Sequence, residues 1–355
     1  MNYSNSISDV NCFLLEHSLL YIKEKVLFID QDNIFINCEG YKISKFLEDI
    51  FIEFFSDDGF EKTIKISINN KHTPVYLSYL QRGEITKEGI TVFLSYDEKY
   101  NTFLNIINIK LENVVWKQLR YTRYFFLIND QYILLYGENQ LICVDFVKNV
   151  QTIDFSLSDF PPYINGFGQE QEVEVIHVMG IYKNILWIHM GDFRIIGLDI
   201  DTGKMVHHIE DLRILLGLGQ EEKYYFNFSP FDKYSLHLDT QKGLLKGFAH
   251  RFYIDIDLNT LTGKVKKDFG EITKESWRIK NSLFYQEAPN LLYFSGSYKS
   301  IDNPNAFGIF DTQKAEIVWY ETSKEEDQFF FNPPQANDKL LAILDSKQNL
   351  LIYEK

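Results

Sequence analysis

Seven segments of the chain share one pattern: an apolar strand, an Asp-centred polar turn and a second strand. From about residue 60 onward, turn residues recur every ~8–12 positions, a spacing typical of many short antiparallel strands. Self-similarity at a period of roughly 40–50 residues is typical of a propeller blade or a solenoid coil. The pattern predicts an all-β chain. The copies are FLNIINIKLENVVWK, LICVDFVKNVQTIDF, RIIGLDIDTGKMVHHI, YSLHLDTQKGLLKGF, RFYIDIDLNTLTGKVKKDF, AFGIFDTQKAEIVWY and LLAILDSKQNLLIYE.

The copies resemble the repeat of quinoprotein-like (PQQ-type), YVTN and WD40-like β-propellers, in which a strand ending in Asp leads through Thr-Gly-Lys to a strand ending in Trp. The matching residues are 201–204 (DTGK), 262–264 (TGK), Trp116 and Trp319. The Trp-Asp dipeptide of strict WD40 blades is missing. The resemblance implies a β-propeller and transfers no catalytic residue. We therefore predict a single domain over residues 1–355, a β-propeller of six or seven blades.

The N-terminal part departs from the repeat. Residues 43–59, ISKFLEDIFIEFFSDDG, place apolar side chains at helical spacing, with Ser44 as an N-cap. They predict a small helical or irregular insertion, which either lies on the propeller or binds a partner. The apolar stretch 19–38 is expected to supply a strand that closes the ring with the C-terminal blade, residues 339–355.

The net charge and the cysteine pattern argue against some classes of partner and indicate a cellular compartment. The net charge of -14 and pI near 5.1 argue against nucleic acid and anionic membranes, because binding phosphates requires a concentrated basic surface. No signal peptide or membrane span is predicted. Cys12, Cys38 and Cys143 are odd in number and widely spaced, which is typical of reduced thiols in a cytoplasmic protein.

The segment GDFRIIGLDIDTGKMVHHIED (191–211) permits three interpretations. A calcium loop counted from Asp199 lacks a ligand at its position 5, which is Gly203. It also has Lys204 at position 6, where the sharp bend requires glycine. An aspartic protease fails because it needs a second such loop. A turn remains favoured, since Asp and Thr hydrogen-bond the local backbone and Gly supplies a positive φ. The predicted structural turn residues are Asp201, Thr202, Gly203, Asp239, Asp311 and Asp345.

One carboxylate row is a candidate metal site. In a strand, Glu170, Glu172 and Glu174 share one face. If that strand is the innermost of a blade, the three carboxylates face the central channel and could bind a metal. The alternative is a solvated outer face. The sequence contains no P-loop, GxSxG elbow or HExxH helix, so we predict no catalytic residue and no cofactor.

Several loops combine Pro, Asn and aromatic residues, which are typical of a protein-binding rim, although Pro and Asn also end strands. The candidate partner-binding residues are Phe160, Tyr163, Phe231, Tyr285, Phe331, Asn332 and Asn337.

The leading functional hypothesis is a non-catalytic protein-binding propeller that is monomeric when free. Its acidity fits a basic partner, and resemblance to acidic, diverged propellers suggests a bacterial immunity protein that binds and neutralises a cognate toxin. The alternative is a metal-dependent propeller hydrolase or lyase that uses carboxylates near the channel. A redox quinoprotein is a third, more distant hypothesis.

Overall fold

The computed structural model describes most of the chain. The described residues are 1–15, 19–23, 26–29, 32–35, 40–46, 49–55, 61–67, 74–77, 80–82, 85–86, 88–96, 102–111, 113–119, 124–137, 139–164, 169–191, 194–218, 236–249, 251–270, 276–284, 288, 290–299 and 304–355.

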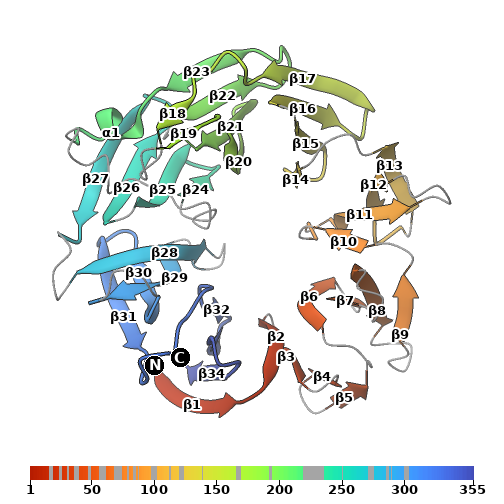
Figure 1. The fold of residues 1–355 in the computed structure, drawn as a ribbon, viewed down its shortest axis with the longest axis vertical. Helices are drawn as coiled ribbons and strands as arrows, with labels where there is room; N and C mark the ends of the chain where they lie inside the picture. The colour runs from red at the N-terminus through yellow and green to blue at the C-terminus, as the bar shows by residue number, and fades with distance from the viewer. Residues whose placement is uncertain are drawn as a thin grey trace.

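In this part of the chain, the strands form a ring of eight four-stranded antiparallel blades (Figure 1). The chain is therefore an all-β propeller, but the prediction of six or seven blades is wrong. We number the blades I to VIII in chain order. Blades I to IV are β2 (Val10–Leu15), β3 (Leu19–Lys23), β4 (Val26–Ile29), β5 (Asp32–Phe35); β6 (Gly40–Phe46), β7 (Asp49–Phe55), β8 (Glu61–Ser67), β9 (Pro74–Leu77); β10 (Leu80–Arg82), β11 (Ile90–Tyr96), β12 (Thr102–Asn108), β13 (Asn113–Leu119); and β14 (Tyr124–Leu127), β15 (Tyr132–Gly137), β16 (Gln140–Asp145), β17 (Val150–Ser156).

The remaining blades complete the ring. Blades V to VIII are β20 (Val175–Tyr182), β21 (Ile185–Met190), β22 (Ile195–Asp199), β23 (Met205–Ile209); β24 (Leu236–Asp239), β25 (Leu244–Ala249), β26 (Phe252–Asp257), β27 (Thr262–Asp268); β28 (Trp277–Phe284), β29 (Leu291–Tyr298), β30 (Ala306–Asp311), β31 (Glu316–Thr322); and β32 (Gln335–Ala336), β33 (Leu340–Leu344), β34 (Leu350–Glu354), β1 (Asn2–Ile7). A separate two-stranded sheet, β18 (Tyr163–Ile164) with β19 (Glu170–Gln171), lies between blades IV and V, and the short helix α1 (Leu212–Leu215) lies between blades V and VI.

The ring closes through the first strand of the chain. Strand β1 pairs antiparallel with β34, so blade VIII combines both ends of the described chain. The Gln335 side chain adds a link to blade I, because its Oε1 accepts a hydrogen bond from Leu15 N at 2.7 Å. We expected the closing strand within residues 19–38, but the described residues there form β3, β4 and β5 of blade I.

Residues 43–59 do not form the predicted insertion: their described part belongs to β6 and β7 of blade II. Strand β7 lies inside the blade and is buried on both faces, with Ile50, Phe51 and Ile52 all at most 3% exposed. A strand buried on both faces loses the apolar–polar alternation, so its apolar run also fits a helical spacing. Blades I and II were not recognised from the sequence, because of this ambiguity and because residues 19–38 were assigned to a single strand.

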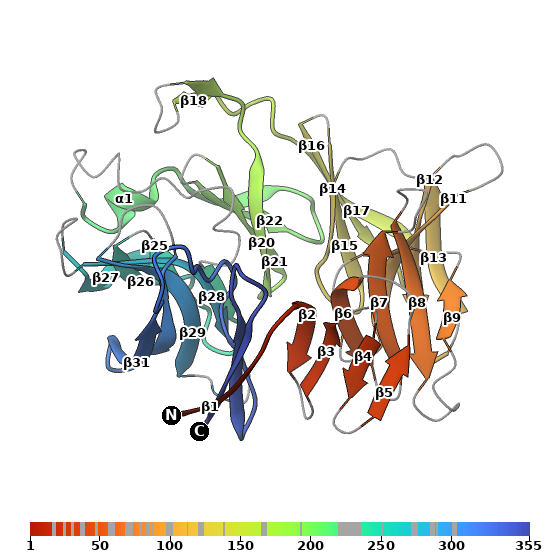
Figure 2. The same ribbon diagram turned by 60° about the horizontal axis from the view of Figure 1, so that its bottom comes forward.

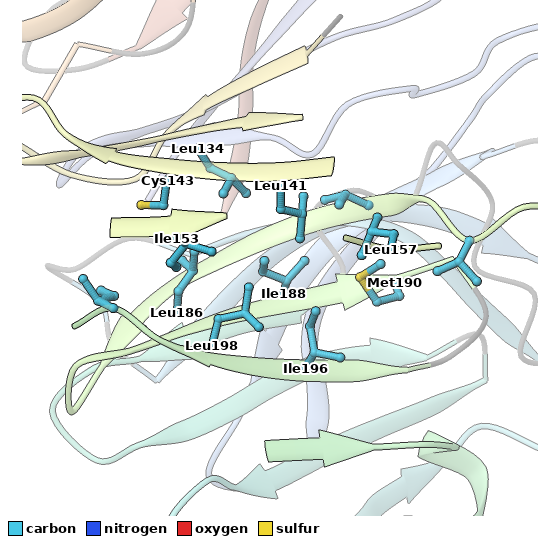
Figure 3. Close-up of a cluster of buried hydrophobic side chains, with 13 residues drawn as sticks. Leu134, Leu141, Cys143, Ile153, Leu157, Leu186, Ile188, Met190, Ile196 and Leu198 are labelled. Atoms are coloured by element: carbon cyan, nitrogen blue, oxygen red, sulfur yellow. The ribbon is translucent and has the colours of Figure 1, made fainter. Parts of the chain in front are cut away.

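The core consists of layers between adjacent blades. Between blades IV and V, for example, Leu134 and Cys143 pack against Leu186, Ile188 and Leu198 (Figure 3). Each face of a blade is buried by its neighbour, which is why every blade is apolar on both sides. Within the described residues, no helix is long and apolar enough to cross a membrane.

The seven sequence copies do not occupy equivalent turns. Five lie between the third and fourth strands of blades III to VII, whereas the copy with Asp239 joins β24 to β25 and the copy with Asp345 joins β33 to β34. In blade III an asparagine replaces the aspartate, and Asn108 Oδ1 accepts a hydrogen bond from Leu111 N at 3.1 Å. Counting unlike turns as one repeat contributed to the wrong blade number.

Candidate interaction surface

The antiparallel blades give the ring two different ends. One end carries the connections from the outer strand of each blade to the inner strand of the next, together with the turns between second and third strands. We call it the connection face. The other end, the turn face, carries the two remaining kinds of turn. Figure 2 shows β18 projecting beyond the blades at the connection face.

The connection between blades IV and V carries the two-stranded sheet of this face. We define the arm as its described residues, 157–164 and 169–174, which carry β18 and β19. In its register, Tyr163 pairs with Gln171 and Ile164 pairs with Glu170. Partners directly opposite each other in an antiparallel pair point to the same face. One face of the hairpin therefore carries Tyr163 and Gln171, and the other carries Ile164 and Glu170.

Phe160 anchors the base of the arm. Its ring lies 5.5 Å from the His208 ring in an edge-on contact and 6.2 Å from the ring of Phe155. The Arg194 guanidinium lies 5.0 Å from the centre of the same ring, within the range of a cation–π contact. Phe160 and Tyr163 are half-buried and pack against the core layer between blades IV and V. Both predicted partner-binding residues thus contribute mainly to holding the arm in place.

Backbone hydrogen bonds fix both ends of the arm. Leu157 N donates to Asn139 O at 2.7 Å, and Gly191 N donates to Glu174 O at 2.9 Å. The Asn139 side chain also donates to Glu172 Oε2 at 3.3 Å. These contacts tie the arm to the second-to-third-strand turns of blades IV and V.

The outer side of the arm is apolar and acidic. Ile164 is 48% exposed, and Pro161, Pro162, Glu170 and Glu172 are exposed as well. Residues 149–182 contain no Lys or Arg but five acids, namely Asp154, Asp159, Glu170, Glu172 and Glu174. Four of them, Asp159, Glu170, Glu172 and Glu174, belong to the arm, which therefore combines negative charge with an exposed isoleucine.

The three glutamates lie outside the innermost strand of blade V, which begins at Val175. Glu170 belongs to β19, and Glu172 and Glu174 lie on the segment that leads to β20; all three are exposed. Among the described residues, no group of three or more His, Cys, Asp or Glu has an arrangement that could hold a metal ion. The premise of the metal site, a carboxylate row along an inner strand, is therefore not met.

An exposed aromatic residue lies on the connection between blades VII and VIII. Phe331 is 58% exposed, and its backbone oxygen accepts a hydrogen bond from Asn281 Nδ2 at 2.8 Å. Asn332 follows it and is exposed. The acids Glu325 and Asp327 on the same connection form ion pairs with Lys347. The charge of this second cluster is thus partly neutralised, whereas no ion pair is present for the acids of the arm among the described residues.

The other predicted partner-binding residues do not join these two groups. Asn337 lies in the turn between β32 and β33, on the turn face, where its Oδ1 accepts hydrogen bonds from Lys339 N at 2.9 Å and Leu340 N at 2.8 Å. It stabilises a turn. Phe231 and Tyr285 lie outside the described residues.

The predicted turn residues lie in turns, with one change of role. Asp199 rather than Asp201 holds the DTGK turn, because Asp199 Oδ1 accepts hydrogen bonds from Thr202 N and Thr202 Oγ1, both at 2.8 Å. These bonds lower the pKa of Asp199. Asp201 instead accepts a bond from Asn184 Nδ2 at 2.8 Å, and Gly203 has a φ of 68°.

Asp239, Asp311 and Asp345 act in the same way as Asp199. Asp311 Oδ1 accepts hydrogen bonds from Gln313 N and Lys314 N, and Asp239 Oδ1 accepts from Gln241 N and Lys242 N. Asp345 is only 5% exposed, and its carboxylate also accepts a bond from Gln328 Nε2 at 2.7 Å. All three carboxylates have a structural part in their turns.

Blade V also contains two buried histidines. His177 and His189 lie opposite each other on β20 and β21. Burial lowers the pKa of His177 to about 4, and burial together with the nearby His177 lowers that of His189 to about 3. Both are therefore neutral near pH 7. Burial also raises the pKa of the free thiol of Cys143 to about 11, which makes it a poor nucleophile.

Comparison with known proteins supports the fold. No protein-family model and no curated protein sequence matches the chain. Among solved structures, the computationally designed protein Ika8 matches with a TM-score of 0.57 and 10% identity, over 98% of this chain and 96% of its own. BamB from Moraxella catarrhalis matches with a TM-score of 0.54 and 10% identity, over 99% of each chain.

The β-propeller domain of Cps50 (Swd1) from Myceliophteria thermophila matches with a TM-score of 0.52 and 11% identity, over 100% of this chain and 99% of that domain. At such low identity, these likenesses show a β-propeller fold and do not single out the PQQ-type or YVTN family.

Sequence reasoning named Glu170 and Phe160, but it missed the pairing of Glu170 with Ile164 and the contact of Arg194 with Phe160. One signal was present, since residues 149–182 contain acids but no Lys or Arg. Ile164 lies beside Glu170 because β18 pairs with β19. This two-stranded sheet is not part of the repeat, so the repeat pattern does not predict it.

Proposed function

We propose that the chain is a non-catalytic protein-binding β-propeller that engages its partner at the connection face. The observation that carries this proposal is the arm: a hairpin fixed at its base, raised above the blades, and exposing an isoleucine among carboxylates. An apolar centre with a polar surround is the usual anatomy of a protein interface. A fixed arm also loses little conformational entropy on binding.

The finer proposal concerns the partner. The net charge of -14 and the exposed acids of the arm favour a basic protein, because complementary charge steers association. In this proposal the chain is a cytoplasmic immunity protein, monomeric when free, that neutralises a cognate toxin by binding it. The proposal needs no nucleic acid, membrane or cofactor.

The test is purification of the tagged chain from its native host at low ionic strength, with mass spectrometry of what is retained. We expect one basic protein in near-equimolar amount, released as salt is raised because screening weakens charge-dominated complexes. Recovery of no stoichiometric partner contradicts the protein-binding function. If a partner is found, its expression with and without the chain tests immunity: growth arrest that the chain fails to relieve contradicts that role.

A further inference from the structure

We propose that β1 exchanges between two copies of this chain: the β1 of each copy pairs with the β34 of the other. The partner is therefore a second copy of this chain, and the docking site is the edge of β34 that β1 covers in the closed ring. At low concentration the closed monomer predominates, and by mass action the exchanged dimer becomes populated as the concentration rises. This inference does not depend on the proposed protein-binding function.

The first support is the position of β1 in its blade. It is the outermost strand of blade VIII, and within the described residues it pairs with β34 alone (Figure 1). Two residues, Ser8 and Asp9, connect it to β2 of blade I. A strand with one neighbour can leave its blade without moving another strand. Exchange of such an element is a low-cost route to a dimer, because the second copy supplies identical contacts.

The second support is the backbone of the connector. Asp9 has a φ of 60°, a left-handed conformation that is costly for an L residue. The bonds that hold the connector lie at the surface: Ser8 Oγ donates to Asp9 Oδ2 at 2.9 Å, and Lys23 Nζ lies 3.7 Å from the same oxygen. A connector that extends between two copies is released from this conformation. Short connectors under strain therefore favour exchange.

The third support is the fit between β1 and β34. The pairing covers five residue pairs and is interrupted by one bulge. Met1, just before β1, and Ile7, its last residue, pack against the core. On β34, Ile352 is 8% exposed and Tyr353 is 4% exposed, so an uncovered β34 exposes apolar surface. The β1 of a second copy covers this surface with the same contacts, which is why it is the matching occupant.

The fourth support is that blade I also contacts blade VIII without β1. Val10 N donates to Gln348 O at 2.9 Å, and Leu15 N donates to Gln335 Oε1 at 2.7 Å. Val10 and Leu15 also pack in one apolar cluster with Ala342 of β33. These contacts keep blade I beside blade VIII while β1 is away from its own blade. In the dimer, each ring is closed by the β1 of the other copy.

The test mixes two single-cysteine variants of the full chain, S6C and L351C, at high protein concentration under mild oxidation. Ser6 and Leu351 lie directly opposite each other on β1 and β34, so a disulfide between the two chains reports an exchanged β1. The control mixes Q140C with S156C, an opposite pair of exposed residues on β16 and β17 of blade IV. Mass spectrometry identifies the linked peptides, and light scattering of the wild-type chain measures the dimer fraction.

We expect S6C to become linked to L351C between chains, and Q140C to remain unlinked to S156C. Placing S6C and L351C in one chain and oxidising it as a dilute monomer should lock β1 and abolish the dimer until the bond is reduced. D9G should raise the dissociation constant of the dimer about tenfold, because glycine adopts this φ in the closed ring without cost. D9N removes the same carboxylate but keeps an L side chain, and should change the constant less than about twofold.

Deleting Ser8 should shift the chain toward the dimer, because the shorter connector hinders the return of β1 to its own blade. If this variant does not fold, the cysteine mixtures still decide, since their substitutions lie outside the connector.

Four results would overturn the inference. The first is a lack of linkage between the S6C and L351C chains although the double variant forms its bond within one chain. The second is equal linkage in the control mixture, and the third is a wild-type chain that stays monomeric at every concentration. The fourth is a dimer that persists in the locked variant, which would place the interface elsewhere. None of these results bears on the binding of a different protein, which purification from the native host tests separately.

Discussion

At the scale of single residues, local turn chemistry determines where one strand ends and the next begins. Asp199 closes its turn through two hydrogen bonds to Thr202, and Gly203 provides the left-handed backbone that the turn requires. The sequence indicated this turn, because Asp, Thr and Gly each have a known part in such turns. It could not distinguish Asp199 from Asp201, since either carboxylate is near enough in sequence to reach the backbone.

Replacing Gly203 by Ala should lower the free energy of unfolding by about 1–2 kcal/mol, the cost of a left-handed conformation for an L residue. The added Cβ would also lie 3.1 Å from Thr152 O of blade IV. Gly217 is the matched control: its φ of 69° imposes the same backbone cost, but no atom of the described residues lies within 4 Å of an added Cβ. Urea denaturation of G203A and G217A should show the larger loss for G203A; equal losses would mean that the inter-blade contact does not matter.

The buried histidines predict an acid-sensitive stability. Their pKa values in the folded chain, about 4 for His177 and about 3 for His189, lie below the unfolded value near 6.5. The unfolded chain therefore binds more protons, so stability is fully present above about pH 6.5 and decreases as the pH falls toward the folded values, by up to about 1.4 kcal/mol per pH unit for each histidine. Melting temperatures of wild type and H189Q between pH 7 and pH 5 should show a smaller decrease for H189Q. Parallel curves would contradict the assignment.

At the scale of elements, the strands of blades III to VII could largely be predicted from alternation and turn residues, whereas blade II could not. Strand β7 buries Ile50, Phe51 and Ile52 in succession, and this continuous apolar run fits a helix as well as a strand. Its pairing with β6 is a contact between segments that no local pattern records. The loop of the arm was recognised as a candidate binding loop through Phe160 and Tyr163, but the pairing of β18 with β19 was not, because a cross-strand register leaves no local motif.

The pair of Lys42 on β6 and Glu53 on β7 tests the corrected assignment. The two residues are direct cross-strand neighbours, with Lys42 Nζ 2.7 Å from Glu53 Oε1, and Glu53 is 2% exposed. The Glu53 carboxylate is buried whereas the Lys42 side chain is 38% exposed, so K42M removes a charged hydrogen bond from a buried carboxylate and should destabilise the chain by about 1–3 kcal/mol. A double-mutant cycle with E53Q should give a coupling energy above about 0.5 kcal/mol, as for residues in contact. Additive losses would argue against this pairing.

At the scale of the whole molecule, closure of the eight-bladed ring depends on the pairing of β1 with β34, which we call the seam. The propeller class could be predicted from the repeat, because blades that are apolar on both sides must pack in a ring. The blade number could not, since it depends on which turns are equivalent and on where β1 pairs. The connection face likewise arises only when the ring closes, and its arm is anchored by residues of blades IV and V that lie far apart in sequence.

Removing residues 1–9 tests the seam. Strand β1 pairs with β34 through five residues, Asn2, Tyr3, Asn5, Ser6 and Ile7. At roughly 0.2–1 kcal/mol per cross-strand pair, the loss should be about 1–5 kcal/mol, with a lower melting temperature and faster proteolysis of blade VIII. A synthetic peptide of residues 1–9 added in trans should restore part of the melting temperature. A truncated chain as stable as the full one would show that β1 contributes little.

The pairing of β1 with β34 has a consequence for biosynthesis. Translation runs from the N-terminus, so Asn2 is made long before Glu354, and β1 leaves the exit tunnel before its hydrogen-bonding partner exists. Blades I to VII can form during translation, but the ring can close only after β34 has been released. Nascent or prematurely terminated chains therefore expose the edges of an open ring, which chaperones and proteases can bind. Only a chain that includes β34 can cover these edges by closing the ring.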